Sequence, residues 1–226
     1  MIKFQNITKV YPPKTIALKS VSFQVEKGEF LVVCGKSGAG KTTLFRLLAA
    51  IEKPTAGKIF YDKTEVTEIK NSQIPSYKRK LGVIYQDYKL LPQMNVFENV
   101  ALAMIVAGKS DSEIFKQAFK ILGMIDLSEK INSFPKELSS GEKQRLAIAR
   151  AIANEPEIIL ADEPTGNLDC YFASELIDIL EKINQSGITI ILATHDRDLV
   201  NSLKKRVITL EDGSIIRDDK EGKLIF

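Results

Sequence analysis

The sequence predicts an α/β fold from three observations. An apolar run, Phe30–Cys34, leads through a glycine-rich loop into a segment whose apolar residues have helical spacing. A second apolar run, Ile158–Ala161, ends in the acidic pair Asp162 and Glu163. From that run onward, strand-like and helix-like segments alternate along the chain, which is typical of α/β proteins.

The N-terminal part, residues 1 to about 30, is predicted to be rich in strands because apolar and polar residues alternate in MIKFQNITKVY. The helix after the glycine-rich loop is expected to reach Ile51. Pro54 and Gly57 then mark a turn. Short strands are expected at Lys58–Tyr61 and at Gly82–Gln86.

The pattern between residues 87 and 154 is helical, with amphipathic segments at Phe97–Gly108 and Ser112–Ile125. A third helix is expected within Leu138–Ile152, where Ser139 to Gly141 form its start and Pro156 ends it. The later elements are predicted as a strand at Ile158–Ala161, a helix at Phe172–Ile183, a strand at Ile188–Ala193, a helix at Leu199–Leu203 and short strands around Asp212–Gly213.

The loop GKSGAGKT, Gly35 to Thr42, has the spacing of a phosphate-binding loop between a strand and a helix. Glycines let the backbone approach a polyphosphate, and amides at the helix start favour negative charge. Lys41 adds a positive charge for the β- and γ-phosphates, while the Thr42 hydroxyl can bind Mg²⁺. A glycine-rich turn without a ligand is the alternative, and the strand–loop–helix setting favours a nucleoside triphosphate.

The pair Asp162 and Glu163 stands where a predicted parallel strand ends, which is the edge of an α/β sheet where ligands bind. One carboxylate can hold Mg²⁺ and the next can orient and deprotonate a water molecule. An ordinary acidic surface pair is the alternative. The phosphate loop earlier in the chain favours a nucleotide-hydrolysing site.

Two further features narrow the function. His195, the only histidine, directly follows a run of β-branched and apolar residues, Ile188–Thr194. A lone histidine is more often structural, but this one follows a strand downstream of a phosphate loop. The helix beginning LSSGE supplies a second predicted anion site at Ser139, Ser140 and Gly141.

These motifs resemble the nucleotide-binding subunits of ABC transporters over essentially the full chain. They occur in the family's order: aromatic Tyr11, Walker A at Gly35 to Thr42, glutamine-loop Gln86, signature LSSGE, Walker B at Ile158 to Glu163, D-loop Asn167 to Asp169, and switch His195. The family's usual signature reads L-S-G-G-Q, so Ser140 and Glu142 depart from it.

The resemblance implies an ABC-type P-loop ATPase core with an N-terminal antiparallel β section and an inserted α-helical lobe. It implies one domain over 1–226, with the core at 1–86 and 156–226 and the lobe at about 87–155. ATP and Mg²⁺ are the implied cofactors. Because the chain has no second phosphate loop, the resemblance implies a homodimer that encloses ATP between head-to-tail copies.

The resemblance also implies the role of each site residue. The catalytic residues would be Glu163 as general base, His195 as γ-phosphate sensor, Gln86 and Lys41. The nucleotide contacts would be Tyr11, Gly35, Lys36, Ser37, Gly38, Ala39, Gly40, Lys41, Thr42, Thr43, Ser139, Gly141 and Asp169, the last three from the other copy. The Mg²⁺ ligands would be Thr42, Gln86 and Asp162. For Tyr11, packing at the end of a strand is the alternative to stacking on adenine.

A closer resemblance, carried by Ile74 to Gly108 and Leu160 to Asp169, is to the cell-division group of these ATPases, which act with an integral membrane protein. ATPases of lipoprotein-release and macrolide-type exporters share parts of the pattern and are the alternative. The resemblance therefore implies a peripheral protein on the cytoplasmic side of the bacterial plasma membrane. A ribosome or DNA clamp ATPase is disfavoured because it would carry tandem ATPase domains or a long coiled coil. The signature and switch histidine argue against a kinase or GTPase.

Composition agrees with this reading. Lysine and arginine total 32 against 29 acidic residues, interspersed along the chain, which indicates a solvated surface and no specific nucleic-acid partner. The basic runs Lys78–Lys80 and Lys204–Arg206 are interpreted as solvated faces. No apolar run approaches the roughly 20 residues that span a bilayer. Membrane attachment is therefore expected through a partner.

An apolar segment follows Gln86 and consists of Tyr88, Leu90, Leu91 and Pro92. Two interpretations remain open. These residues either pack inside the helical lobe, or they form a groove that receives a cytoplasmic helix of the membrane partner.

Overall fold

This computed structural model describes residues 1–222, without the side chain of Cys170, and it divides into two compact units. The first unit combines Met1–Lys78 with the chain from Gly187 onward. The second unit is Arg79–Ser186. These limits differ from those of the predicted core and lobe, which remain a prediction.

The N-terminal section of the first unit is an antiparallel sheet. It consists of β1 (Ile2–Tyr11), β2 (Thr15–Val25), β4 (Ala56–Tyr61) and β5 (Thr64–Glu65), in the order β2-β1-β4-β5. Alternate side chains of its strands are buried, and the rings of Phe4 and Phe23 stack with centroids 4.5 Å apart. The predicted antiparallel β section is confirmed.

The second sheet of this unit contains the strand that precedes the phosphate loop. Its strands within this unit are β3 (Phe30–Cys34), β8 (Thr189–Thr194), β9 (Arg206–Glu211) and β10 (Ser214–Asp219), in the order β10-β9-β3-β8. β3 is parallel to β8 and β9, and every residue of β3 is buried. Burial on both faces explains why this strand reads as an unbroken apolar run.

Short helices complete the first unit: α1 (Lys41–Leu48), α2 (Ile74–Lys78), α7 (Arg197–Leu203) and the 3-10 turns Val66–Glu68 and Asn71–Gln73. α2 was not predicted from the sequence. It is held by Tyr77, whose buried hydroxyl donates to the carbonyl of Leu48 at 2.6 Å, and burial raises the pKa of that hydroxyl. This bond satisfies a carbonyl at the end of α1.

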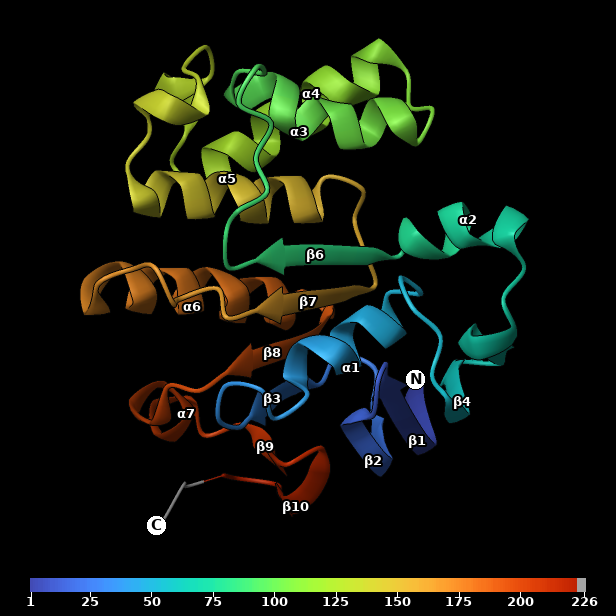
Figure 1. Cartoon of the computed structure of the whole chain (residues 1–226). Helices are drawn as coiled ribbons and strands as arrows, with labels where there is room; N and C mark the ends of the chain where they lie inside the picture. The colour runs from blue at the N-terminus through green and yellow to red at the C-terminus, as the bar shows by residue number, and fades with distance from the viewer. Residues whose placement is uncertain (223–226) are drawn as a thin grey trace. The chain divides into compact units, whose positions relative to one another are not determined.

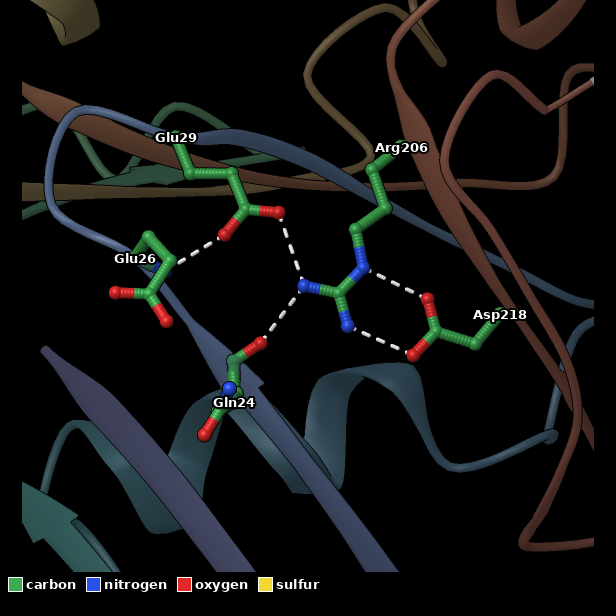
Figure 2. Close-up of polar contacts among 5 residues, drawn as sticks. All are labelled: Gln24, Glu26, Glu29, Arg206 and Asp218. Atoms are coloured by element: carbon green, nitrogen blue, oxygen red, sulfur yellow. Dashed lines mark hydrogen bonds and ion pairs between the residues drawn. The ribbon is translucent and has the colours of Figure 1, made fainter.

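The expectation that Arg206 lies on a solvated face is wrong, because its guanidinium lies in a polar cluster (Figure 2). Its Nε and Nη2 each donate to Asp218 at 2.7 Å. Its Nη1 donates to Glu29 at 2.9 Å and to the carbonyl of Gln24 at 2.8 Å. These carboxylates raise the pKa of the guanidinium. The Arg206 side chain thus joins β9 to β10, to the end of β2 and to the residue that precedes β3.

The second unit pairs β6 (Leu81–Tyr85) with β7 (Ile158–Asp162) in parallel. Its helices are α3 (Val96–Val106), α4 (Asp111–Met124), α5 (Ser140–Ile152) and α6 (Cys170–Gln185), with 3-10 turns at Ser128–Lys130 and Pro135–Glu137. Helices α3, α4 and α5 pack together, and α5 lies against β6 (Figure 1). Within residues 1–222, none of the helices has the length and apolar character needed to cross a membrane.

The starts of three of these helices follow from a local sequence signal. Asn95, Ser110 and Ser139 each accept a hydrogen bond from the backbone of a glutamate three residues later, whose carboxylate bonds back. This capping box satisfies amides that a helix start leaves unpaired. The predicted helices therefore begin close to where the sequence indicates.

Candidate functional site

The phosphate loop adopts a conformation that requires glycine at its end. Gly40 precedes α1 with a φ of 106°, and a Cβ there would lie 2.5 Å from the carbonyl oxygen of Ala17. The loop thereby turns directly into α1, whose first turn carries no acidic residue and includes Thr42 and Thr43. The amides at a helix start favour the binding of an anion.

Lys41 is buried at the start of α1 and holds the loop from within. Its ammonium donates to the carbonyl oxygens of Gly35, at 2.7 Å, and Lys36, at 3.2 Å. A lysine that already points along the loop needs little rearrangement to meet a phosphate. The geometry therefore fits the role predicted for Lys41.

His195 lies beside this loop because of strand register. In the parallel pair β3 and β8, Cys34 stands opposite Thr194, so the loop and His195 leave neighbouring strands at the same edge. A pocket of ≈ 500 Å³ is lined by residues 35–39, His195 and residues 209–212, among others. The side chain of His195 is exposed. The structure thus brings the predicted switch histidine to the predicted phosphate loop.

Tyr11 is half-buried at the end of β1, where a polar cluster orients it. Its hydroxyl donates to Glu52 at 2.7 Å, and the ammonium of Lys9 lies 5.0 Å from the ring centroid. Glu52 also pairs with Lys9 at 3.1 Å and Arg46 at 2.6 Å. Burial and the bond to Glu52 raise the pKa of Tyr11, while a hydrogen bond with Thr43 lowers it. Tyr11 therefore lies next to α1, and its stacking on adenine stays a prediction.

In the second unit, strand register brings Gln86 next to the acidic pair. Tyr85 stands opposite Asp162 in the parallel pair β6 and β7, so Gln86 and Glu163 occupy the next positions. A Cβ on Gly166 would lie 2.9 Å from the Gln86 Nε2, so the D-loop turn closes onto this glutamine. Glu163 has a φ of 50°, a strained backbone of the kind that clusters at functional sites.

The predicted signature forms the start of α5. The Ser139 hydroxyl accepts from the Glu142 amide at 3.3 Å, and the Glu142 carboxylate accepts from the Ser139 amide at 2.8 Å. That backbone bond lowers the pKa of Glu142, which keeps a negative charge at this helix start. Gly141 is buried, and a Cβ there would lie 2.9 Å from the ring of Phe172 on α6. The Ser139 hydroxyl proton remains able to donate to an anion.

The D-loop residues surround the start of α6. Asp169 is the N-cap, and its carboxylate accepts from the amides of Tyr171 at 3.1 Å and Phe172 at 3.0 Å. Asn167 donates from Nδ2 to the carbonyl oxygen of Gln86 at 2.7 Å. The loop that carries Gln86 is thus joined to the D-loop within this unit.

Three residues that organise these loops were not found from the sequence. Asn99 is fully buried on α3, and its side chain bonds Leu91 N–H and the carbonyls of Leu91, Met94 and Asn95 at 2.9 to 3.1 Å. Arg150 on α5 bonds the loop after Gln86, and Glu52 orients Tyr11. For Asn99, the available signal was a polar residue at a buried position within a predicted helix.

The predicted site residues are thus gathered in two sets. The first unit holds Tyr11, residues 35–43 and His195, and the second holds Gln86, Ser139, Gly141, Asp162, Glu163 and Asp169. Each set consists of loops that leave the ends of neighbouring strands or the starts of helices.

The family model described as ABC transporter matches residues 18–166, more than half of the chain, so the chain belongs to the ABC transporter family. The match confirms the predicted class, an ABC-type ATPase. Among proteins, the cell division ATP-binding protein FtsE of Bacillus subtilis (strain 168) is 45% identical over 223 residues, covering 99% of this chain and 98% of that protein. The protein of the same name from Escherichia coli (strain K12) is 41% identical, covering 95% of this chain and 97% of its own.

Solved structures agree with these relatives. The ATP-binding cassette MJ0796, in a dimeric post-hydrolysis state bound to ADP and Pi, matches with a TM-score of 0.89 at 35% identity, covering 98% of this chain and 99% of that chain. CbiO1 of Clostridium perfringens, part of an ABC transporter complex, matches with a TM-score of 0.90 at 29% identity, covering 97% of this chain and 88% of that chain. The predicted ABC-type fold is confirmed.

Proposed function

We propose that this chain is the ATP-hydrolysing subunit of a membrane-bound cell-division complex and that it dimerises around ATP. The main support is the likeness to FtsE proteins, which extends over nearly the whole of both chains. The proposed partner is an FtsX-like integral membrane protein, and the proposed location is the cytoplasmic side of the bacterial plasma membrane. The same likeness favours this function over an exporter of the lipoprotein-release or macrolide type.

The chemistry follows from the residues. Lys41 and the amides of residues 35–43 hold the phosphates, Tyr11 takes the adenine, and His195 contacts the γ-phosphate. Water attacks the γ-phosphorus, Glu163 accepts its proton, and the bond to the oxygen of ADP breaks. Thr42, Gln86 and Asp162 would hold Mg²⁺ through the oxygen donors that it prefers, and there it would neutralise phosphate charge. Ser139, Gly141 and Asp169 come from the second copy.

Whether each ATP site is built from residues of both copies can be tested by mixing two inactive chains. A Lys41→Ala chain and a Ser139→Arg chain each form homodimers without an intact site. Mixed at equal amounts, they are expected to recover roughly a quarter of the parent ATPase rate, because random pairing makes half of the dimers mixed and each mixed dimer has one intact site of two. A mixture as inactive as its components would contradict the shared site.

The segment after Gln86 supports a docking role for the partner. Tyr88, Leu90 and Leu91 are half-buried and Pro92 is exposed, so this apolar segment is not part of the core. Its backbone is nevertheless fixed by Asn99 and Arg150. A fixed, partly exposed apolar segment is suited to receive an apolar helix.

Docking can be separated from folding with a matched pair of double variants. Leu90→Glu with Leu91→Glu is expected to abolish co-purification with the membrane partner, because two carboxylates cannot enter an apolar contact. Thermal melting and the ATPase rate without partner should change little. The control is Ile105→Glu with Val106→Glu, an apolar pair that is 57% and 73% exposed on α3. Retained co-purification of the Leu90 and Leu91 variant, or equal loss in the control, would exclude this surface.

Glu142 provides a test of the signature. Glu142→Gln keeps the capping box and removes a negative charge from a helix start that meets the γ-phosphate. ATP-driven dimers are expected to tighten by about tenfold, or about 1.4 kcal/mol, as a like charge is removed. Analytical ultracentrifugation with ATP measures this in chains that also carry Glu163→Gln. Glu113→Gln, the same position in the capping box of α4, should leave dimerisation unchanged. Unchanged or weaker association in Glu142→Gln would contradict the role of the signature.

A further inference from the structure

The loop that follows β6 is strained at two adjacent positions. Tyr88 has a φ of 59° and Lys89 a φ of 51°, a region that residues with side chains seldom adopt. Such a conformation persists only where the surroundings impose it. Residues 86–89, which include Gln86 of the proposed ATPase site, are therefore held by contacts from other elements.

Arg150 donates hydrogen bonds to the main chain at both strained positions. Its Nη1 donates to the carbonyl of Lys89 at 2.5 Å and its Nη2 to the carbonyl of Tyr88 at 2.7 Å, across 61 and 62 positions of sequence. The planar guanidinium presents its N–H donors to the two adjacent carbonyls in a fixed fork, whereas a lysine would present one flexible ammonium. Arg150 is half-buried, and this burial lowers the pKa of its guanidinium.

The other end of the loop is held from the D-loop, where Asn167 donates to the carbonyl of Gln86 at 2.7 Å. Arg150 lies near the end of α5, and Ser139 caps its start. At a rise of about 1.5 Å per residue, the two are separated by about 16 Å of continuous helix. The loop of Gln86 is thus fastened to the two elements, signature helix and D-loop, that the proposed function assigns to the neighbouring ATP site.

We propose that Arg150 is a positioning residue of the ATPase: its guanidinium fixes the main chain of residues 86–89 and joins the Gln86 loop rigidly to the signature helix. The effect on catalysis rests on the proposed function, whereas the fixing of the loop does not. Movement of the loop at one ATP site is then carried along α5 to the signature that serves the other.

The loop can be monitored directly because the chain contains no tryptophan. Tyr88→Trp provides a single fluorescent reporter whose backbone carbonyl still accepts from Arg150. Adding Arg150→Met should raise acrylamide quenching of this reporter several-fold, and Arg150→Lys should give an intermediate value because an ammonium lacks the fixed planar fork of N–H donors that holds both carbonyls. The control is Arg145→Met, which removes an arginine on the same helix that faces Glu175 at 3.5 Å and should leave quenching unchanged.

Kinetics in the chains without the reporter supply the second measurement. Arg150→Met is expected to lower kcat by about 10- to 100-fold, the cost of misplacing a positioned group, with KM for ATP nearly unchanged. Quenching at the parent level in Arg150→Met, or an equal rise in Arg145→Met, would overturn the proposal. If Arg150→Met does not fold, parent-level quenching in Arg150→Lys would overturn it equally. A parent chain without ATPase activity would instead contradict the proposed function and leave the quenching result valid.

Discussion

Glu163→Gln is expected to bind ATP but to hydrolyse it about 10²- to 10⁴-fold more slowly, the usual contribution of a general base. The amide has the size of the carboxylate but cannot accept a proton from water. Glu163 follows Asp162 at the end of β7, and its φ of 50° directs its backbone out of the strand. The expected product is a dimer with ATP trapped in it, detected by size-exclusion chromatography with ATP.

The matched control is Glu155→Gln. Glu155 also has a left-handed backbone, with a φ of 52°, and its exposed carboxylate accepts from Gln117 at 3.2 Å. It lies in the same unit but in none of the proposed ATP contacts. Turnover at the parent rate in Glu163→Gln, or a monomer as the only species with ATP, would remove Glu163 from the role of base.

The elements of the fold that could be predicted are those whose signal is local. β3 is an unbroken apolar run and β8 a run of apolar and β-branched residues because every residue of each strand is buried, and α4 begins with the capping box of Ser110 and Glu113. α2 was missed because its support is the bond from Tyr77 to the carbonyl of Leu48, across 29 positions of sequence. Periodicity carries no information about such a bond.

The same distinction applies to the site. The phosphate loop, the acidic pair and His195 are readable because each chemistry is contained in a short motif that adjoins a strand. Arg150 and Glu52 are not readable, since each acts on a loop or ring remote in sequence. Asn99 bonds residues only four to eight positions away, and its one signal in the sequence is a polar residue within an apolar predicted helix. Arg206 was misinterpreted for a related reason: a basic run looks the same whether its charge meets water or, as here, Asp218 and Glu29.

Lys41→Ala is expected to lose ATP hydrolysis by about 10²- to 10³-fold or more, the cost of removing one fixed donor to developing charge. ATP binding should weaken as well, because the phosphates lose their nearest fixed positive charge. In the structure the ammonium already holds the carbonyls of Gly35 and Lys36, so its loss also releases the loop.

Three further chains separate these effects. Lys41→Arg keeps the charge but, being bulkier in a buried position, should recover ATP binding more than turnover. Lys19→Ala, which changes an exposed lysine on β2, should behave as the parent.

A Tyr77→Phe chain loses the bond that supports the end of α1, so its melting temperature should fall while its ATPase rate is retained. Isothermal titration with ATP measures ATP binding, and a phosphate-release assay measures the ATPase rate. If Lys41→Ala turns over at the parent rate, the phosphates are not held where α1 begins, and the assignment of the phosphate loop fails.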